Sequence, residues 1–177
     1  MLNKKIQDAL NAQINAEQHS SNLYLAMAAW CEKMSLKGFA SWFRVQAAEE
    51  LVHVTKFFDY VLDRRGEVVL QAIAAPPHEW KSAEDVMQAT FDHEQYVTSL
   101  IHKLADLAIG EKDHPTHSLL EWFIDEQVEE EASVDQILSQ IRLTGNAPAG
   151  LFMIDRELGT RTFTPVPTVN FPPTTAN

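Results

Sequence analysis

Residues 39 to 60 read FASWFRVQAAEELVHVTKFFDY, and the fold we expect follows from this stretch. One set of its side chains recurs in steps of three and four, the spacing that brings residues onto one face of an α-helix. That face consists of Phe39, Phe43, Gln46, Glu50, His53, Phe57 and Tyr60. Its aromatic residues indicate a buried face, yet a carboxylate and an imidazole lie at its centre. The stretch therefore predicts a long helix that carries chelating groups into a protein core.

Three further stretches have the same helical periodicity. Together with the first, they predict α-helices at about residues 4–33, 36–64, 83–110 and 114–143. Residues 66–82, which contain adjacent prolines and an apolar run (residues 68–70) that could form a strand without an evident partner, separate the second helix from the third. A connection of this length can cross a whole bundle. The sequence thus predicts an all-α four-helix bundle with a long crossover between its second and third helices.

The C-terminal region changes character twice. A short amphipathic segment at about residues 149–158 predicts a fifth helix. Residues 164–177 are rich in proline, which fits neither a helix interior nor a central strand. We expect one domain over residues 1–160, followed by an extended proline-rich tail over residues 161–177 that lies against a protein surface.

The composition narrows the class of partner. The chain has 25 acidic and 14 basic residues, a formal net charge of -11, which argues against a nucleic-acid partner and favours cations. Its single cysteine, Cys31, excludes an internal disulfide and a cysteine-based metal cluster. No window reaches the roughly 18 consecutive apolar residues that a membrane helix needs. We expect a cytoplasmic protein that binds neither nucleic acid nor a membrane.

Polar residues recur at the midpoint of each expected helix, on the face that should be buried. They are Glu17, Glu50, His53, Glu94, Gln127 and Glu130. A buried charge is costly unless it is paired or bound to a metal, and too few basic residues face inward to neutralise these carboxylates. Glu50 and His53 lie three residues apart and can bind one ion together. Oxygen donors with a single imidazole suit iron, manganese or zinc, and a bundle of this kind usually holds an iron pair bridged by a glutamate.

A second group of carboxylates lies beside the first. Glu126, Glu129 and Glu130 share one stripe of the fourth helix and should face Glu49 of the second helix, which favours a further and weaker cation site. The alternative for such a cluster is a solvated helix face. For the layer as a whole, the alternative is an inert bundle whose carboxylates are structural.

These residues resemble those of a known family. Glu17 with Tyr24, the string AAEELVH at residues 47–53, Glu94, and the string DEQVEE at residues 125–130 are similar, in identity and in spacing, to a non-haem ferritin of the prokaryotic type. The similarity covers about residues 1–160 and leaves out the proline-rich tail.

The resemblance implies a set of iron ligands. One iron would be held by Glu17, Glu50 and His53, and a second by Glu94 and Glu130, with Glu50 as the bridge and Gln127 close to both. A third iron would use Glu49, Glu126, Glu129 and Glu130. Tyr24 and Trp122 match family aromatics beside the iron pair that could donate electrons, although ordinary core packing explains them equally well.

The resemblance also implies a function. The protein would oxidise Fe(II) with O2 or peroxide and store Fe(III) as a mineral inside a hollow cage of twenty-four subunits. Haem is not expected, because haem-binding relatives carry a methionine directly after the bridging glutamate, where this chain has Leu51, and a second Glu-x-x-His motif, where it has Gln127 to Glu130.

Two other functions remain open at this point. A DNA-protecting mini-ferritin usually has a basic N-terminal arm, and residues 1–8 contain only Lys4 and Lys5 as basic side chains. A diiron peroxidase or oxygenase generally has two Glu-x-x-His motifs, and here there is one.

Overall fold

The computed structural model describes residues 2–145 and 147–163, and this part of the chain contains five α-helices and no strand. The helices are α1 (Lys4–Lys33), α2 (Lys37–Asp63), α3 (Ala83–Gly110), α4 (His114–Leu143) and α5 (Pro148–Leu158). The predicted all-α class and the helix boundaries are confirmed, the boundaries to within one residue. The expected tail beyond residue 163 lies outside the described residues, and a domain boundary at residue 160 stays a prediction.

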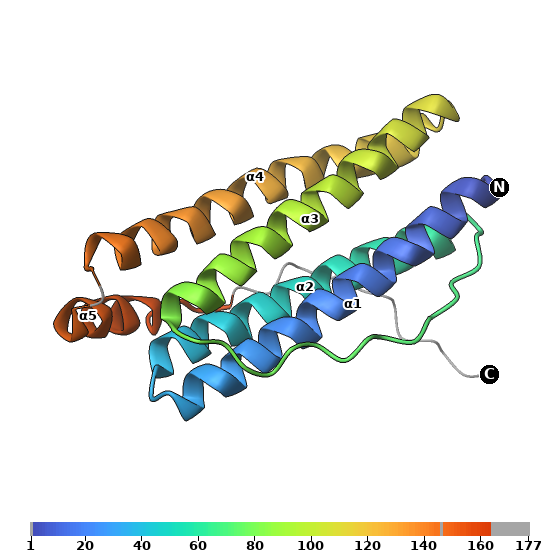
Figure 1. The fold of residues 1–177 in the computed structure, drawn as a ribbon. Coiled ribbons are helices and arrows are strands. Elements are labelled where there is room, and N and C mark those ends of the chain that lie inside the picture. Colours follow the sequence, from blue (N-terminus) through green and yellow to red (C-terminus); the bar gives the residue numbers. More distant parts are fainter. Residues whose placement is uncertain (1, 146, 164–177) are drawn as a thin grey trace.

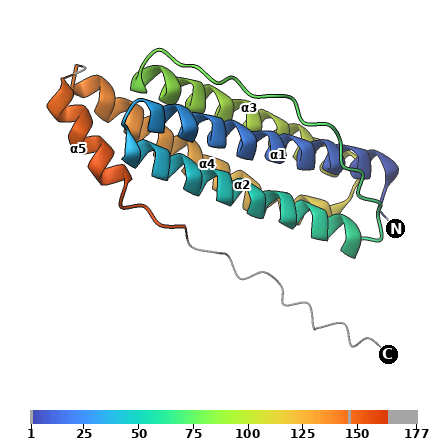
Figure 2. The ribbon, with the colours of Figure 1, turned by 90° about the horizontal axis from the view of Figure 1, so that it is seen from below.

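The first four helices form two antiparallel pairs, α1 with α2 and α3 with α4, packed into one elongated bundle (Figure 1). The crossover between α2 and α3 returns along the full length of the bundle, so that these two helices run in the same direction (Figures 1 and 2). The helix α5 lies across one end. The crossover that the sequence predicted is therefore confirmed, and its apolar run at residues 68–70 forms no strand.

Amide side chains spaced four residues apart on α1 hold the crossover in place. Gln7 Oε1 accepts from the Glu67 backbone N–H at 2.9 Å. Asn11 donates to the Glu67 carbonyl at 2.9 Å and accepts from the Val69 N–H at 2.9 Å. Asn15 donates to the carbonyl of Ala72 at 3.2 Å. A segment without regular structure thus satisfies part of its backbone through one face of a neighbouring helix.

Side chains supply hydrogen-bond acceptors at the starts of two helices. Ser82 accepts from the backbone N–H of Asp85 at 3.1 Å and so caps α3. Asp155 on α5 accepts from the N–H groups of Gly38 and Phe39, at 2.8 and 3.0 Å, and so supplies the start of α2 with an acceptor from another helix. At Gly38 an added Cβ would lie 1.5 Å from the Asp155 carbonyl oxygen, so this close approach requires glycine.

A layer of polar side chains divides the apolar core into two clusters. One cluster, nearer α5, is centred on Tyr24, Phe39 and Phe43. The other, at the opposite end of the bundle, is centred on Phe57 and Phe123. Between the clusters lies what we call the polar layer, which consists of Glu17, Glu50, His53, Glu94, Gln127 and Glu130. The chelating residues therefore occupy the middle of the bundle, as their sequence positions predicted.

Candidate metal centre

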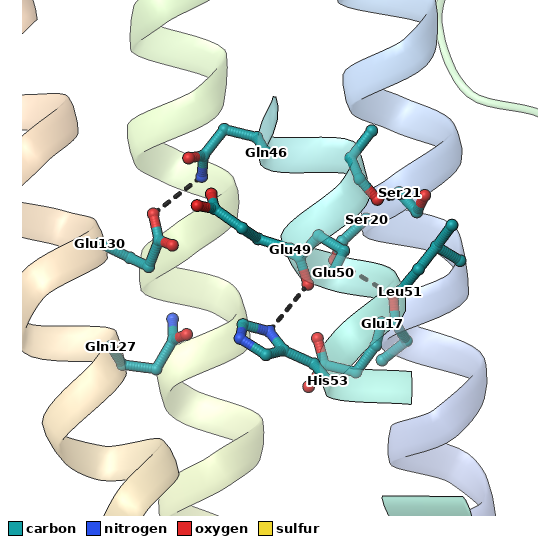
Figure 3. Close-up of polar contacts among 12 residues, drawn as sticks. Glu17, Ser20, Ser21, Gln46, Glu49, Glu50, Leu51, His53, Gln127 and Glu130 are labelled. Carbon is teal, nitrogen blue, oxygen red and sulfur yellow. Dashed lines mark hydrogen bonds and ion pairs between the residues drawn. The ribbon is translucent and has the colours of Figure 1, made fainter. Parts of the chain in front are cut away.

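Every member of the polar layer is buried, the most exposed being Glu130 at 7%. Side chains from α1, α2 and α4 converge on the space between the helices (Figure 3). The structure therefore turns all six predicted residues inward. Because charged groups are almost never this buried without a partner, each carboxylate needs a specific neighbour or a cation.

Glu17, Glu50 and His53 form the tightest group. Each offers one ligand atom, and these atoms lie within 4.8 Å of one another; the described residues contain no other group of three such side chains that is this close. His53 Nδ1 lies 3.3 Å from Glu50 Oε2. Glu17 Oε1 accepts from Gln13 Nε2 at 2.8 Å, whereas the buried Glu17 Oε2 has no hydrogen-bond partner among the described residues. A cation bound here would supply the partner that this oxygen lacks.

Glu94 and Glu130, on α3 and α4, are held differently. Glu94 accepts from the Tyr24 hydroxyl through Oε1 and from Gln127 Nε2, at 3.1 Å, through Oε2. Glu130 Oε2 accepts from Gln46 Nε2 at 2.8 Å. Neutral donors thus contact both oxygens of Glu94 and one oxygen of Glu130.

Three carboxyl groups of the layer, those of Glu17, Glu50 and Glu94, hold their protons tightly. Burial, followed by the charge of Glu50, raises the pKa of Glu17 to about 8. Burial and then the charge of Glu130 raise the pKa of Glu94 to about 7, and burial and then the charge of Glu94 raise the pKa of Glu50 well above its usual value. Since metals bind the deprotonated form, a cation entering the layer must displace protons.

The residues expected at a third site lie at the edge of the layer. Glu49 and Glu126 are half-buried and Glu129 is exposed. Burial raises the pKa of Glu49 and of Glu126, and the charge of Glu130 raises both further. The charges of these four carboxylates thus act on one another. No three of the four, however, bring their ligand atoms as close together as Glu17, Glu50 and His53 do.

The two aromatic candidates both touch the layer. Tyr24 is fully buried and donates its hydroxyl hydrogen to Glu94. The Trp122 ring lies 5.6 Å from the His53 ring in an edge-on arrangement, and Lys56 Nζ lies 3.4 Å above the centroid of Trp122. Their positions suit a role beside the metal ligands and equally suit packing.

Three residues that contact the site were given no role in the sequence analysis. Gln13 lies one turn before Glu17 and Gln46 one turn before Glu50, so helical spacing could have indicated both as hydrogen-bond partners of the layer. Arg161 donates to Gln46 and Glu49 from beyond α5. No local pattern indicates that contact, because 112 residues separate Arg161 from Glu49.

Comparison with known proteins identifies the family. The sequence profile of the ferritin-like domain matches residues 7–144, which span all of α2, α3 and α4 and all of α1 except its first turn. The chain belongs to the ferritin family. Within it, a probable bacterial non-heme ferritin-like protein of Haemophilus influenzae is 41% identical over 159 residues, covering 90% of this chain and 96% of the relative. A bacterial non-heme ferritin of Staphylococcus aureus is 39% identical over 163 residues, covering 92% and 98%.

Solved structures of ferritins have the same fold. An Archaeoglobus fulgidus ferritin engineered into a closed form superimposes with a TM-score of 0.92 at 46% identity, covering 93% of this chain and all of that one (100%). The open-pore ferritin of the same organism gives 0.91 at 44% identity, covering 92% and 100%. The resemblance stated from the sequence is confirmed, and the fold is that of a ferritin subunit with a short fifth helix. None of the helices described in this ferritin is long and apolar enough to cross a bilayer.

Proposed function

We propose that this ferritin oxidises Fe(II) at a paired iron site in the polar layer and stores the Fe(III) product as a mineral. The observation that carries the proposal is the convergence of Glu17, Glu50 and His53 within 4.8 Å, with one buried carboxylate oxygen left without a protein partner. The chemistry of the donors, two carboxylates and one imidazole, suits Fe(II) as substrate.

In this proposal the six residues of the layer divide between two iron ions. Glu17 and His53 bind the first and Glu94 and Glu130 the second, while Glu50 bridges them and Gln127 lies close to both. Glu50 is suited to bridging because it lies 3.3 Å from His53, while burial and then the charge of Glu94, on the opposite helix pair, raise its pKa. Each Fe(II) loses one electron, and the two electrons together reduce O2 to the level of hydrogen peroxide, or peroxide to water.

The remaining residues prepare the ligands. The Gln13 amide fixes one oxygen of Glu17 and leaves the other free to bind. The Tyr24 hydroxyl and the Gln127 amide hold Glu94 from two sides until a cation replaces them. Protons leave Glu17 and Glu94 as the cations bind, because the pKa of each carboxyl group is raised.

Storage requires assembly, and we propose a homo-oligomeric cage of twenty-four subunits in the cytoplasm, without haem. Large apolar side chains exposed on the single subunit support burial against copies of the chain. They include Leu25 at 50%, Leu51 at 52%, Leu62 at 49%, Val69 at 50% and Leu70 at 60% exposure. Glu49, Glu126, Glu129 and Glu130 would form the third iron site.

The test is iron oxidation by matched variants. Fe(II) is added without oxygen, air is admitted, and Fe(III) is followed by its ultraviolet absorbance; size-exclusion chromatography then gives the iron content per particle. We expect rapid oxidation by the wild type and a loss of roughly 100-fold or more in Glu50→Ala and His53→Ala, since each change removes a direct ligand. Glu121→Ala, at an exposed carboxylate on α4, is the control and should behave as the wild type. Oxidation at the wild-type rate by either ligand variant would overturn the proposal.

A further inference from the structure

Arg161 reaches the edge of the polar layer from the segment that follows α5. One guanidinium nitrogen donates to Gln46 Oε1, and the other donates to Glu49 Oε2 at 2.7 Å. The guanidinium carbon also lies 5.2 Å from the centroid of the Trp42 ring. The Arg161 side chain is 30% exposed, so the guanidinium is held between an aromatic face and two polar partners at the boundary with solvent.

The contact with Gln46 fixes the direction of an amide. A guanidinium only donates hydrogen bonds, so Arg161 can pair only with the oxygen of the Gln46 side chain. The amide nitrogen must then face the other way, where it donates to Glu130 Oε2 at 2.8 Å. Arg161 therefore orients a ligand of the proposed iron pair through one intervening residue.

The contact with Glu49 occupies a carboxylate that a cation could use. The ion pair of Arg161 and Glu49 is short and partly shielded, with side-chain exposures of 30% and 27%. A cation that binds Glu49 Oε2 must displace the guanidinium or share the oxygen with it. The same guanidinium thus acts on Glu49 directly and on Glu130 through Gln46, and these are two of the four carboxylates of the proposed third site.

We propose that Arg161 is a positioning residue that competes with a third cation for Glu49 and so limits how tightly that cation binds beside the iron pair. The inference rests on the proposed function, because it takes Glu49 and Glu130 to be ligands of the third iron site proposed above. With Arg161 on Glu49 the third site is weak, and iron must displace the guanidinium in order to use it.

The test is a calorimetric titration of the full-length, metal-free protein with Zn(II), which binds oxygen and imidazole ligands without redox chemistry. In Arg161→Met we expect the first Zn(II) ion, which does not use Glu130, to bind within about twofold of the wild type and the third to bind roughly three- to tenfold tighter, the size of effect expected for removing a partly shielded ion pair. Arg161→Lys, which keeps the charge but not the forked geometry, should fall between the two. Arg156→Met, at an exposed arginine on α5, is the matched control.

A double-variant cycle separates competition from a general loosening of the segment. In a Glu49→Gln background, Arg161→Met should change the third Zn(II) affinity by much less than it does in the wild type, because the contested oxygen has lost its charge and only the contact through Gln46 to Glu130 remains. Melting temperatures check that each variant is folded. An unchanged or weaker third affinity in Arg161→Met, while the first Zn(II) ion binds normally, would overturn the inference alone. Wild-type protein that binds no Zn(II) through Glu50, judged against Glu50→Ala, would instead overturn the proposed function.

Discussion

The two halves of the polar layer differ in how their carboxylates are satisfied. On α1 and α2, Glu17 keeps one buried oxygen without a partner among the described residues, and its neighbours are themselves chelating groups. On α3 and α4, hydrogen bonds from Tyr24, Gln127 and Gln46 hold Glu94 and Glu130. One half is therefore arranged for a cation and the other for neutral donors, which implies that the first cation binds more tightly than the second.

We expect the largest effect on cation binding when Glu50, the ligand proposed for both cations, is replaced, and a smaller effect when Glu94, a ligand of one cation, is replaced. Glu50→Ala should remove tight binding of both cations, since Glu50 is the proposed bridge between them, whereas Glu94→Ala should remove only the second. Zn(II) titration distinguishes the two outcomes as a loss of two ions or of one per subunit. Equal losses in both variants would mean that the halves do not fill separately.

The stability of the metal-free protein should fall as the pH rises. The pKa of Glu17 is raised from 4.5 to about 8 in the folded state, so between these pH values the folded protein binds more protons than the unfolded chain. The contribution of Glu17 to the free energy of unfolding is then fully present below about pH 4.5. It is lost as the pH rises towards 8, by on the order of a few kcal/mol. Glu94, with a pKa raised to about 7, contributes in the same direction.

Urea unfolding of the metal-free protein at pH 5.5 and at pH 8 measures this effect. Glu17→Gln keeps the shape without the titration and should flatten the pH dependence. Saturating Zn(II) should restore more stability at pH 8 than at pH 5.5, because protons and metal compete for the same oxygens. A stability that rises with pH over this range in the wild type would contradict the burial argument.

The smallest expected effect concerns the donors of the second half. Tyr24→Phe removes the hydroxyl that holds Glu94 Oε1, and the free energy of unfolding of the metal-free protein should fall by about 1–2 kcal/mol. With Zn(II) bound the difference should shrink, because the cation takes over that oxygen. Tyr96→Phe, at an exposed tyrosine on α3, is the control. A difference that persists unchanged with metal would mean that Tyr24 does not yield its place to the cation.

The helices, and the position of the site halfway along them, could be predicted because both depend on the spacing of residues that are close in sequence. The three-and-four spacing, interrupted by glycine and proline, placed every helix boundary within one residue, and the helix midpoints placed Glu17, Glu50 and Glu94 in one layer. The hydrogen-bond partners of the polar layer were harder to predict. Gln13 and Gln46 lay on the right faces but were not assigned, since an inward amide has no single chemical meaning.

The contact between Arg161 and Glu49, which are far apart in the sequence, could not be predicted from the sequence pattern. Arg161 meets Glu49 only because α5 returns the chain across the end of the bundle, and periodicity carries no information about such a return. The carboxylates expected at the third site lie on α2 and α4, yet a guanidinium already holds one of them. A pattern of acidic residues therefore predicts which carboxylates lie close together. Which group binds them depends on the tertiary fold.

The division of the core into two apolar clusters has a consequence for local opening. The clusters on either side of the polar layer share little apolar contact through it, so without metal each end of the bundle can fray independently. Ions bridged by residues from all four long helices would tie the ends together. Amide hydrogen exchange should then slow at both ends of the bundle when cations bind. Cation binding would thus turn two weakly coupled ends into one cooperative unit.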